Sequence, residues 1–224
     1  MSPRSRSEPA EANAPLAVKL LFVRHGATEW NRTKRAQGHA DIDLDDRGRR
    51  QAAAAADELA AFDVAAVYSS DLARAVHTAE PIALRHGLPV EVDPDFKEID
   101  QGDWTGLDPK AIGERWPELW PQRSWCDRPG GESPTAVRSR ALRAIHRVLE
   151  THSEGTVVVV THGGLIRWVS AEALGHDDRG SDRMRGLTNG GAVSMDARLH
   201  DDRVVLDNLV RLDGGAASLD DPNV

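Results

Sequence analysis

Short apolar runs alternate along the chain with longer stretches in which apolar residues recur every three or four positions. The runs Leu20–Val23, Val64–Tyr68 and Val157–Val160 predict β-strands. Two of these runs are continuously apolar, which is typical of strands covered on both faces, as in a parallel sheet. We expect two later strands at Gly191–Asp196 and Val204–Val210.

The stretches between these runs predict helices that each bury one apolar stripe. Asp71 is the expected N-cap of the second helix, and Ser133-Pro134 are the expected N-cap and first residue of the third. A fourth helix, Leu165–Leu174, should end before Gly175. Strands that alternate with helices predict an α/β fold with right-handed crossovers. The inward-facing stripes are Gly48, Ala52, Ala55, Leu59 and Phe62 in the first helix, Leu72, Ala75, Val76, Ala79, Ile82 and Ala83 in the second, and Val137, Ala141, Ala144 and Val148 in the third.

Both ends of the chain differ in composition from the rest. Residues 1–15 have no large apolar side chain other than Met1, and residues 213–224 are dominated by small and polar side chains. Such segments bury too little apolar surface to offset the entropy of ordering, so we expect disordered tails. The remaining residues, 16–212, are expected to form one domain.

Composition excludes several classes of protein. The formal net charge of −8 over 224 residues argues against nucleic-acid or anionic-membrane binding. Cys126 is the only cysteine, so no internal disulfide and no cysteine-based metal cage can form. No apolar run is long enough to span a membrane, and no convincing signal peptide is present. We therefore expect a cytoplasmic protein, and the sequence leaves a homo-oligomer open.

Reactive side chains follow three of the predicted strands directly. Arg24-His25-Gly26 follows the first, Ser69-Ser70-Asp71 and then Arg74 follow the second, and Thr161-His162-Gly163-Gly164 follow the valine run. Because ligands bind at the carboxyl ends of the strands in an open parallel sheet, two histidines and two arginines can meet there. Each of these residues alone has a structural explanation, and only their coincidence points to a site.

The charges of this group favour an anion. Two arginines repel a metal cation, no HExxH motif is present, and arginine forks match the geometry of a phosphate. No GxxxxGK[ST] or GxGxxG motif is present, so the corresponding nucleotide-binding folds are not indicated. We expect a phosphoryl ligand, with no metal and no cofactor.

Five segments in order resemble one known family. They are LFVRHGATEWN (21–31), VYSSDLARAVHTAEPIA (67–83), KEIDQGDWTGL (97–107), GGES (130–133) and VVVVTHGGLIRWV (157–169). Together they resemble the phosphoglycerate-mutase-like branch of the histidine phosphatase superfamily, over about residues 18–196. The resemblance implies a three-layer α/β/α sandwich with a mostly parallel central sheet, and a phosphohistidine mechanism.

The resemblance also implies a role for individual residues. His25 matches the nucleophile, and Arg24, Arg74 and His162 match the phosphate pocket. Glu98 matches the acid that protonates the leaving group. The matching substrate contacts are Asn31, Gln37, Gly38 and Gly163.

Elementary chemistry agrees with these roles. Nearby arginines favour the neutral, nucleophilic form of His25. Glu98 stands next to Ile99 and close to Trp104, a partly apolar setting that would favour the protonated acid. Glu132 either orients a group of the pocket or complements the dipole of the helix that follows it.

The substrate is less clear from the sequence. Residues 104–128 carry Trp104, Trp116, Trp120, Trp125 and several arginines, which form either a substrate lid or a cover over the sheet edge. The favoured function is a metal-independent phosphomonoesterase that acts on a small phosphorylated metabolite, such as a sugar or sugar-acid phosphate. The alternatives are a phosphoglycerate mutase and a catalytically inactive binding module of the same fold.

Overall fold

A computed structural model describes residues 17–176 and 186–212, and the two expected tails, 1–15 and 213–224, lie outside that part. The described chain contains a six-stranded sheet with the order β3-β2-β4-β1-β5-β6. The three early strands and the two late ones occur where the apolar runs predict them. The strands are β1 (Val18–Arg24), β2 (Val64–Ser69), β3 (Val90–Val92), β4 (Gly155–Thr161), β5 (Ala192–His200) and β6 (Arg203–Arg211).

The sheet is parallel over β3, β2, β4 and β1, and β5 then runs antiparallel to β1. The β5–β6 pair is an antiparallel hairpin at the edge of the sheet. The expectation of a mostly parallel α/β sheet is therefore confirmed. The central strand β4 carries the continuous valine run, because it has a strand on each side and helices over both faces.

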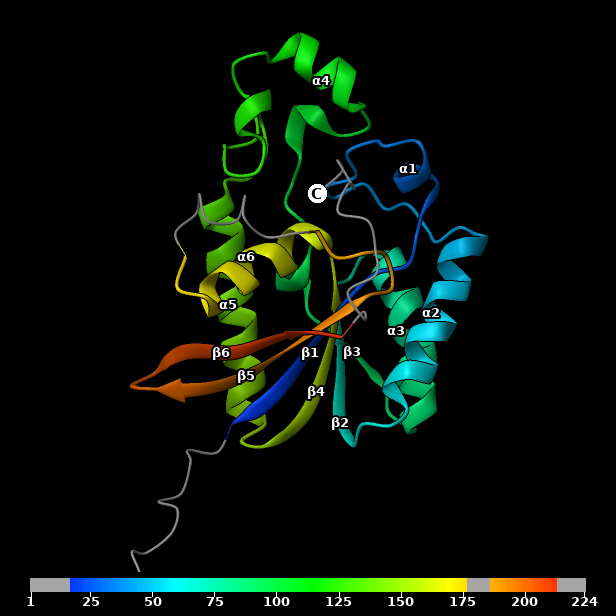
Figure 1. Ribbon diagram of the computed structural model, residues 1–224, viewed down its shortest axis with the longest axis vertical. Coiled ribbons are helices and arrows are strands. Elements are labelled where there is room, and N and C mark those ends of the chain that lie inside the picture. The colour runs from blue at the N-terminus through cyan, green and yellow to red at the C-terminus, as the bar shows by residue number, and fades with distance from the viewer. Residues whose placement is uncertain (1–16, 177–185, 213–224) are drawn as a thin grey trace, which may run out of the picture.

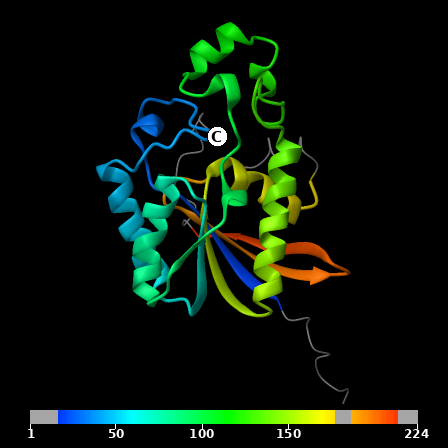
Figure 2. The ribbon, with the colours of Figure 1, turned by 180° about the vertical axis from the view of Figure 1, so that it is seen from behind.

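Helices cover both faces of the sheet (Figure 1). Helices α2 and α3 pack over one face, and α5 and α6 pack over the other, as the view from behind also shows (Figure 2). The helices are α1 (Glu29–Arg32), α2 (Asp46–Leu59), α3 (Ala73–His86), α4 (Pro109–Arg115), α5 (Pro134–Thr151) and α6 (Gly163–Ala173), with short 3₁₀ turns η1 (Pro94–Phe96), η2 (Gly102–Trp104) and η3 (Trp120–Gln122).

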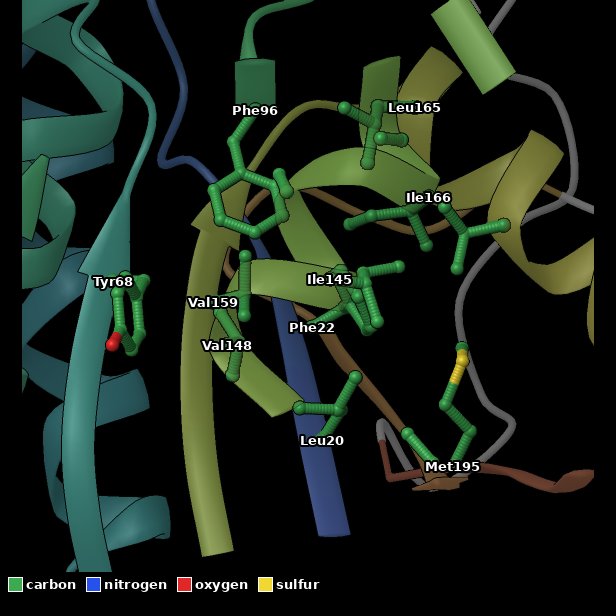
Figure 3. Close-up of a cluster of buried hydrophobic side chains, with 14 of the residues drawn as sticks. Leu20, Phe22, Tyr68, Phe96, Ile145, Val148, Val159, Leu165, Ile166 and Met195 are labelled. Carbon is green, nitrogen blue, oxygen red and sulfur yellow. The ribbon is translucent and has the colours of Figure 1, made fainter. Parts of the chain in front are cut away.

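Neighbouring residues of β1 face opposite layers, as the period of a strand requires. Leu20 and Phe22 belong to the core under α5 and α6, whereas Leu21 and Val23 belong to the core under α2 and α3. Phe96 of η1 is fully buried in the first core, which also contains Val159 and Leu165 (Figure 3). The segment that leads to Glu98 is thus anchored by a buried ring.

The predicted helix ends are confirmed at Ser133, whose side chain accepts from the backbone of Ala136, and at Gly175, which has a positive φ of 67°. The predicted N-cap Asp71 is wrong. Helix α3 begins at Ala73 after Leu72, and the N–H of Ala73 donates to the distant Asp41 carboxylate at 2.8 Å.

A small lobe stands beyond the carboxyl ends of the strands and contains η2, α4 and η3 (Figure 1). Its own core is formed by Trp104, Ile112 and Cys126, with Trp116 and Trp120 packed against them. The indole rings of Trp104 and Trp120 meet edge to face with centroids 6.3 Å apart. No helix in the described part of the chain is long and apolar enough to cross a membrane.

Candidate active site

Three strand ends meet at the edge of the sheet from which the lobe rises. The N–H of His25 donates to the carbonyl of Thr161, and the N–H of Ser70 donates to the carbonyl of Val160. These bonds join the turns after β1, β2 and β4. The rings of His25 and His162 consequently lie side by side, with centroids 5.2 Å apart and planes tilted by 58°.

His25 is buried, and its ring is oriented by its own backbone turn. Its Nδ1 lies 2.7 Å from the carbonyl oxygen of Gly26, which can only accept, so Nδ1 carries the proton and Nε2 has a free lone pair. Burial, followed by the charges of Arg74 and Arg24, lowers the pKa of His25 well below its usual range, against a smaller opposing effect of the Gly26 bond. The ring is therefore neutral at neutral pH.

His162 is fully buried at the start of α6. Its Nε2 lies 2.9 Å from the hydroxyl oxygen of Ser70, and its Nδ1 is buried without a hydrogen-bond partner. Burial, then the charges of Arg74 and His25, lowers the pKa of His162 well below its usual range. A buried polar atom without a partner is costly, so this nitrogen is a candidate contact for a ligand.

Arg74 is fully buried and held by the loop before α2. Its two terminal nitrogens donate to the carbonyls of Ala40 and Gly38 at 2.7 Å each, while Nε has no hydrogen-bond partner. Burial lowers the pKa of Arg74 to about 10, which keeps it charged at neutral pH. Arg24, also buried, donates to the carbonyl of Leu187. Two buried arginines thus supply positive charge around His25.

Glu98 lies on the loop between η1 and η2 and is half-buried. One of its carboxylate oxygens accepts from the N–H of Ile99 at 2.9 Å, and the other accepts from the N–H of Gly164 at 3.0 Å. The second bond ties Glu98 to the turn that carries His162. The structure therefore brings His25, His162, Arg24, Arg74 and Glu98 together at one edge.

The four expected substrate contacts have different surroundings. Asn31 and Gln37 both offer side-chain oxygens to the Thr28 hydroxyl at 3.1 Å. Gly38 holds Arg74 through its carbonyl and adopts a positive φ of 50°, and Gly163 is the first residue of α6. In this structure these residues support the site, and direct contacts of all four to a substrate stay a prediction.

Other residues at the site had no clear signal in the sequence. Asn189 donates to the backbone carbonyl of His25 at 3.0 Å. Nε2 of His39 lies 2.9 Å from the carbonyl of Glu98, a distant residue in the chain. Arg140 binds the same carbonyl. Only Ser70 lay in a segment that the strand-end argument had already marked.

Arginines stacked on the tryptophans of the lobe bear on whether the lobe is a substrate lid or a structural cover. Trp104 is buried, and the guanidinium of Arg128 lies over its ring at 4.7 Å. Arg123 covers Trp120 in the same way at 4.6 Å. These indole faces are occupied by arginines of the lobe itself, which favours a structural role for Trp104 and Trp120.

The side chains that could bind a metal ion are scattered in the described part of the chain. Within residues 17–176 and 186–212, no cluster of three or more histidine, cysteine or acidic side chains could hold one. The charged groups that surround His25 are arginines instead.

Sequence comparison with known proteins agrees with a phosphoryl site at His25. The family model described as histidine phosphatase superfamily (branch 1) matches residues 20–209. The chain is 39% identical to a glucosyl-3-phosphoglycerate phosphatase of Mycolicibacterium vanbaalenii over 169 residues, 70% of this chain and 74% of the relative. It is 38% identical to phosphoserine phosphatase 1 of Hydrogenobacter thermophilus over 166 residues, 71% of this chain and 78% of the relative.

Solved structures agree with the sequence comparison. A mycobacterial glucosyl-3-phosphoglycerate phosphatase in complex with VO3 superposes with a TM-score of 0.79 at 31% identity. The match covers 85% of this chain and 96% of the other.

Proposed function

The chain belongs to branch 1 of the histidine phosphatase superfamily, and on that premise we propose that it hydrolyses small phosphate monoesters through a phosphohistidine on His25. The observation that carries this proposal is the state of the His25 ring. Its Nδ1–H is engaged by the Gly26 carbonyl, so a neutral Nε2 is available beside Arg24, Arg74 and His162.

In the first step, Nε2 of His25 attacks phosphorus and a new N–P bond forms while the ester P–O bond breaks. Negative charge on the transferring group is neutralised by Arg24 and Arg74, with His162 as a further contact. Because both arginines are buried and pre-oriented by backbone carbonyls, little reorganisation is needed during the reaction.

Glu98 serves as the acid and then as the base. An aliphatic alkoxide is a poor leaving group, so the proton of the Glu98 carboxylic acid passes to the ester oxygen as the P–O bond breaks, and the alcohol departs. Water then attacks the phosphohistidine, the N–P bond breaks, and the water proton returns to the Glu98 carboxylate. The balance is one ester and one water consumed, one alcohol and one phosphate formed.

The names of the relatives support a narrower substrate class. Phosphoserine and glucosyl-3-phosphoglycerate both contain a three-carbon acid unit that carries the phosphoryl group on carbon 3 and a substituent on carbon 2. We propose a carboxylate-bearing phosphate ester of this kind as the substrate of this chain. A screen for phosphate release would include phosphoserine, 3-phosphoglycerate, glucosyl-3-phosphoglycerate and simple sugar phosphates.

The mechanism is tested by trapping the intermediate. Protein mixed with ³²P-labelled substrate and quenched should carry a phosphoryl label that is stable in base and labile in acid. His25→Ala should lose the label and nearly all activity, whereas His200→Ala, a change at a side chain 75% exposed, should retain both. Full activity of His25→Ala would overturn the proposal, and absence of turnover on every ester would favour an inactive binding module.

A further inference from the structure

Four consecutive backbone carbonyls lead up to Glu98, and every one accepts a hydrogen bond from a side chain. Thr161, the last residue of β4, donates its hydroxyl to the carbonyl of Phe96 at 2.6 Å. Arg140 of α5 donates to the carbonyls of Asp95, Lys97 and Glu98 at 2.8, 2.6 and 2.7 Å. Carbonyl acceptors of a loop are normally left to water, so this arrangement fixes the loop unusually firmly.

Arg140 is itself held in one orientation. Its Nε and one terminal nitrogen donate to the two carboxylate oxygens of Glu132 at 3.0 and 2.9 Å, a bidentate pair. The side chains of Arg140 and Glu132 are 9% and 23% exposed. Burial works against the ionised form of Glu132, but bonds from Arg140 and from the N–H of Asp100 outweigh it and lower its pKa. The pair is therefore charged at neutral pH.

A second link joins Glu98 to the phosphate-binding arginine. The Glu98 carbonyl also lies 2.9 Å from Nε2 of His39, and that nitrogen must donate because a carbonyl can only accept. The residue before His39 is Gly38, whose carbonyl binds Arg74. One short loop segment thus contacts both the backbone of Glu98 and the guanidinium of Arg74.

We propose that Arg140, locked by Glu132, is a positioning residue that sets the place of the Glu98 carboxyl group relative to the ester oxygen of the substrate. This inference rests on the proposed function, in which Glu98 is the acid. It also gives Glu132 of the GGES segment a role: Glu132 orients Arg140, and Arg140 touches neither the substrate nor the reacting atoms.

The proposal differs from a general stabilising role in what it predicts. A shift of about 1 Å in the carboxyl group can cost on the order of 10²-fold in rate. That loss should fall on esters that need a proton donor. p-Nitrophenol is a far stronger acid than an aliphatic alcohol, so p-nitrophenyl phosphate needs little protonation and should be affected much less.

The test compares two substrates in wild type and three variants. Wild type, Glu98→Gln, Arg140→Lys and Glu132→Gln are assayed with the best alkyl phosphate and with p-nitrophenyl phosphate. We expect Arg140→Lys to lose at least 10-fold more activity on the alkyl ester than on the aryl ester, with the change in kcat rather than in KM. Glu132→Gln should show the same pattern more weakly. Arg138→Lys on the same helix, whose side chain pairs with Glu172 of α6 and not with the segment before Glu98, is the matched control.

A double variant separates positioning from destabilisation. If Arg140 acts through Glu98, Arg140→Lys should add almost nothing to the alkyl-ester loss in a Glu98→Gln background, whereas independent effects would multiply. Equal losses of Arg140→Lys on both esters, or multiplying losses, would overturn the proposal. If Glu98→Gln alone fails to discriminate the esters, the acid role of Glu98 fails instead. Should Arg140→Lys not fold, Glu132→Gln, which keeps Arg140, decides by the same two criteria.

Discussion

The N–H of Gly164 donates a 3.0 Å hydrogen bond to the carboxylate of Glu98, so the proposed acid is fixed to the turn that follows His162. A side chain at position 164 would occupy the same space. A Cβ built on Gly164 collides with the Glu98 carboxyl group and presses on the ring of Trp168. Glycine is required here by the close approach of the carboxyl group, since its φ is not positive.

Gly164→Ala should therefore displace the end of the Glu98 side chain, because a flexible side chain moves more readily than the backbone. We expect turnover of an alkyl phosphate to fall by at least about 10-fold more than turnover of p-nitrophenyl phosphate. Steady-state kinetics with both esters measure this. Gly113→Ala is the control, since its Cβ would make only an ordinary 3.4 Å contact with Trp120. Equal losses on the two esters would show that Gly164 does not act through Glu98.

Chelators should leave the rate almost unchanged. The positive charge assigned to the phosphoryl group is that of Arg24 and Arg74, and both arginines act on the pKa of His25. The measurement is phosphate release before and after dialysis against EDTA, followed by addition of Mg²⁺ or Zn²⁺. Activity that disappears in EDTA and returns with a divalent ion would contradict this assignment of charge.

Stability should fall as the pH drops below about 6.5, the ordinary pKa of histidine. In the folded protein the pKa values of His25 and His162 are lowered well below that value, so both rings stay neutral while the unfolded chain binds protons. The unfolded state is then favoured, by up to about 1.4 kcal/mol per pH unit for each ring, until the folded pKa is reached.

Urea unfolding between pH 7.5 and 5 tests this, and the comparison is with His25→Asn. In His25→Asn the free energy of unfolding should fall less steeply with decreasing pH, because one of the two buried histidines is missing. In His200→Asn it should fall as steeply as in wild type. The pKa of His146 is raised by its hydrogen bond with Asp202, so its effect on the pH dependence of stability is opposite in sign. This effect is common to all the proteins, and the test therefore uses the difference in slope between wild type and variant. Parallel curves for wild type and His25→Asn would refute the prediction.

Trp104→Ala should loosen the lobe more than the sheet. Trp104 is 2% exposed and forms the small core with Ile112 and Cys126, separate from the two cores at the sheet. Removal of a buried aromatic ring costs about 3–5 kcal/mol. Hydrogen exchange should accelerate within residues 109–126 and stay slow in β4 and α5. A uniform acceleration along the chain would show that the lobe and the sheet unfold together.

The meeting of the site residues at one edge of the sheet could be predicted from the sequence, because it depends only on which residues directly follow each strand. Each of His25, Arg74 and His162 follows an apolar strand closely, and parallel strands bring their carboxyl ends to one edge. The sequence also marked Ser133, since an N-cap acts within one turn of its own helix.

Features that depend on distant partners could not be predicted in this way. Asp71 is a residue type that often caps helices, but the carboxylate of Asp41 accepts the hydrogen bond from the first N–H of α3. Asp71 instead pairs with Lys97 at 2.8 Å. Strand β3 is only three residues long and exposed, so it has no apolar run to detect. In the sequence nothing distinguishes Arg140 from the other arginines of its amphipathic helix. Its contact with the carbonyl of Glu98 forms only in the folded chain.

Hydrolysis should outrun transfer to a second phosphoryl acceptor. The mutases of the family that this chain resembles carry a long insertion after the acidic motif, whereas here only residues 108–132 separate Leu107 from Ser133. Part of that short segment packs into its own core with Trp104. The only tyrosine, Tyr68, lies in β2 rather than shortly after Glu98, where the mutases place one.

The deciding assay supplies 3-phosphoglycerate with a trace of 2,3-bisphosphoglycerate and follows 2-phosphoglycerate and free phosphate in the same sample. We expect free phosphate to accumulate with little isomerisation, because water reaches phosphorylated His25 before a second acceptor does. A pulse of labelled phosphoprotein mixed with excess glycerol gives the same partition independently. Rapid formation of 2-phosphoglycerate with little phosphate release would make the chain a mutase, whatever the length of its segment after the acidic motif.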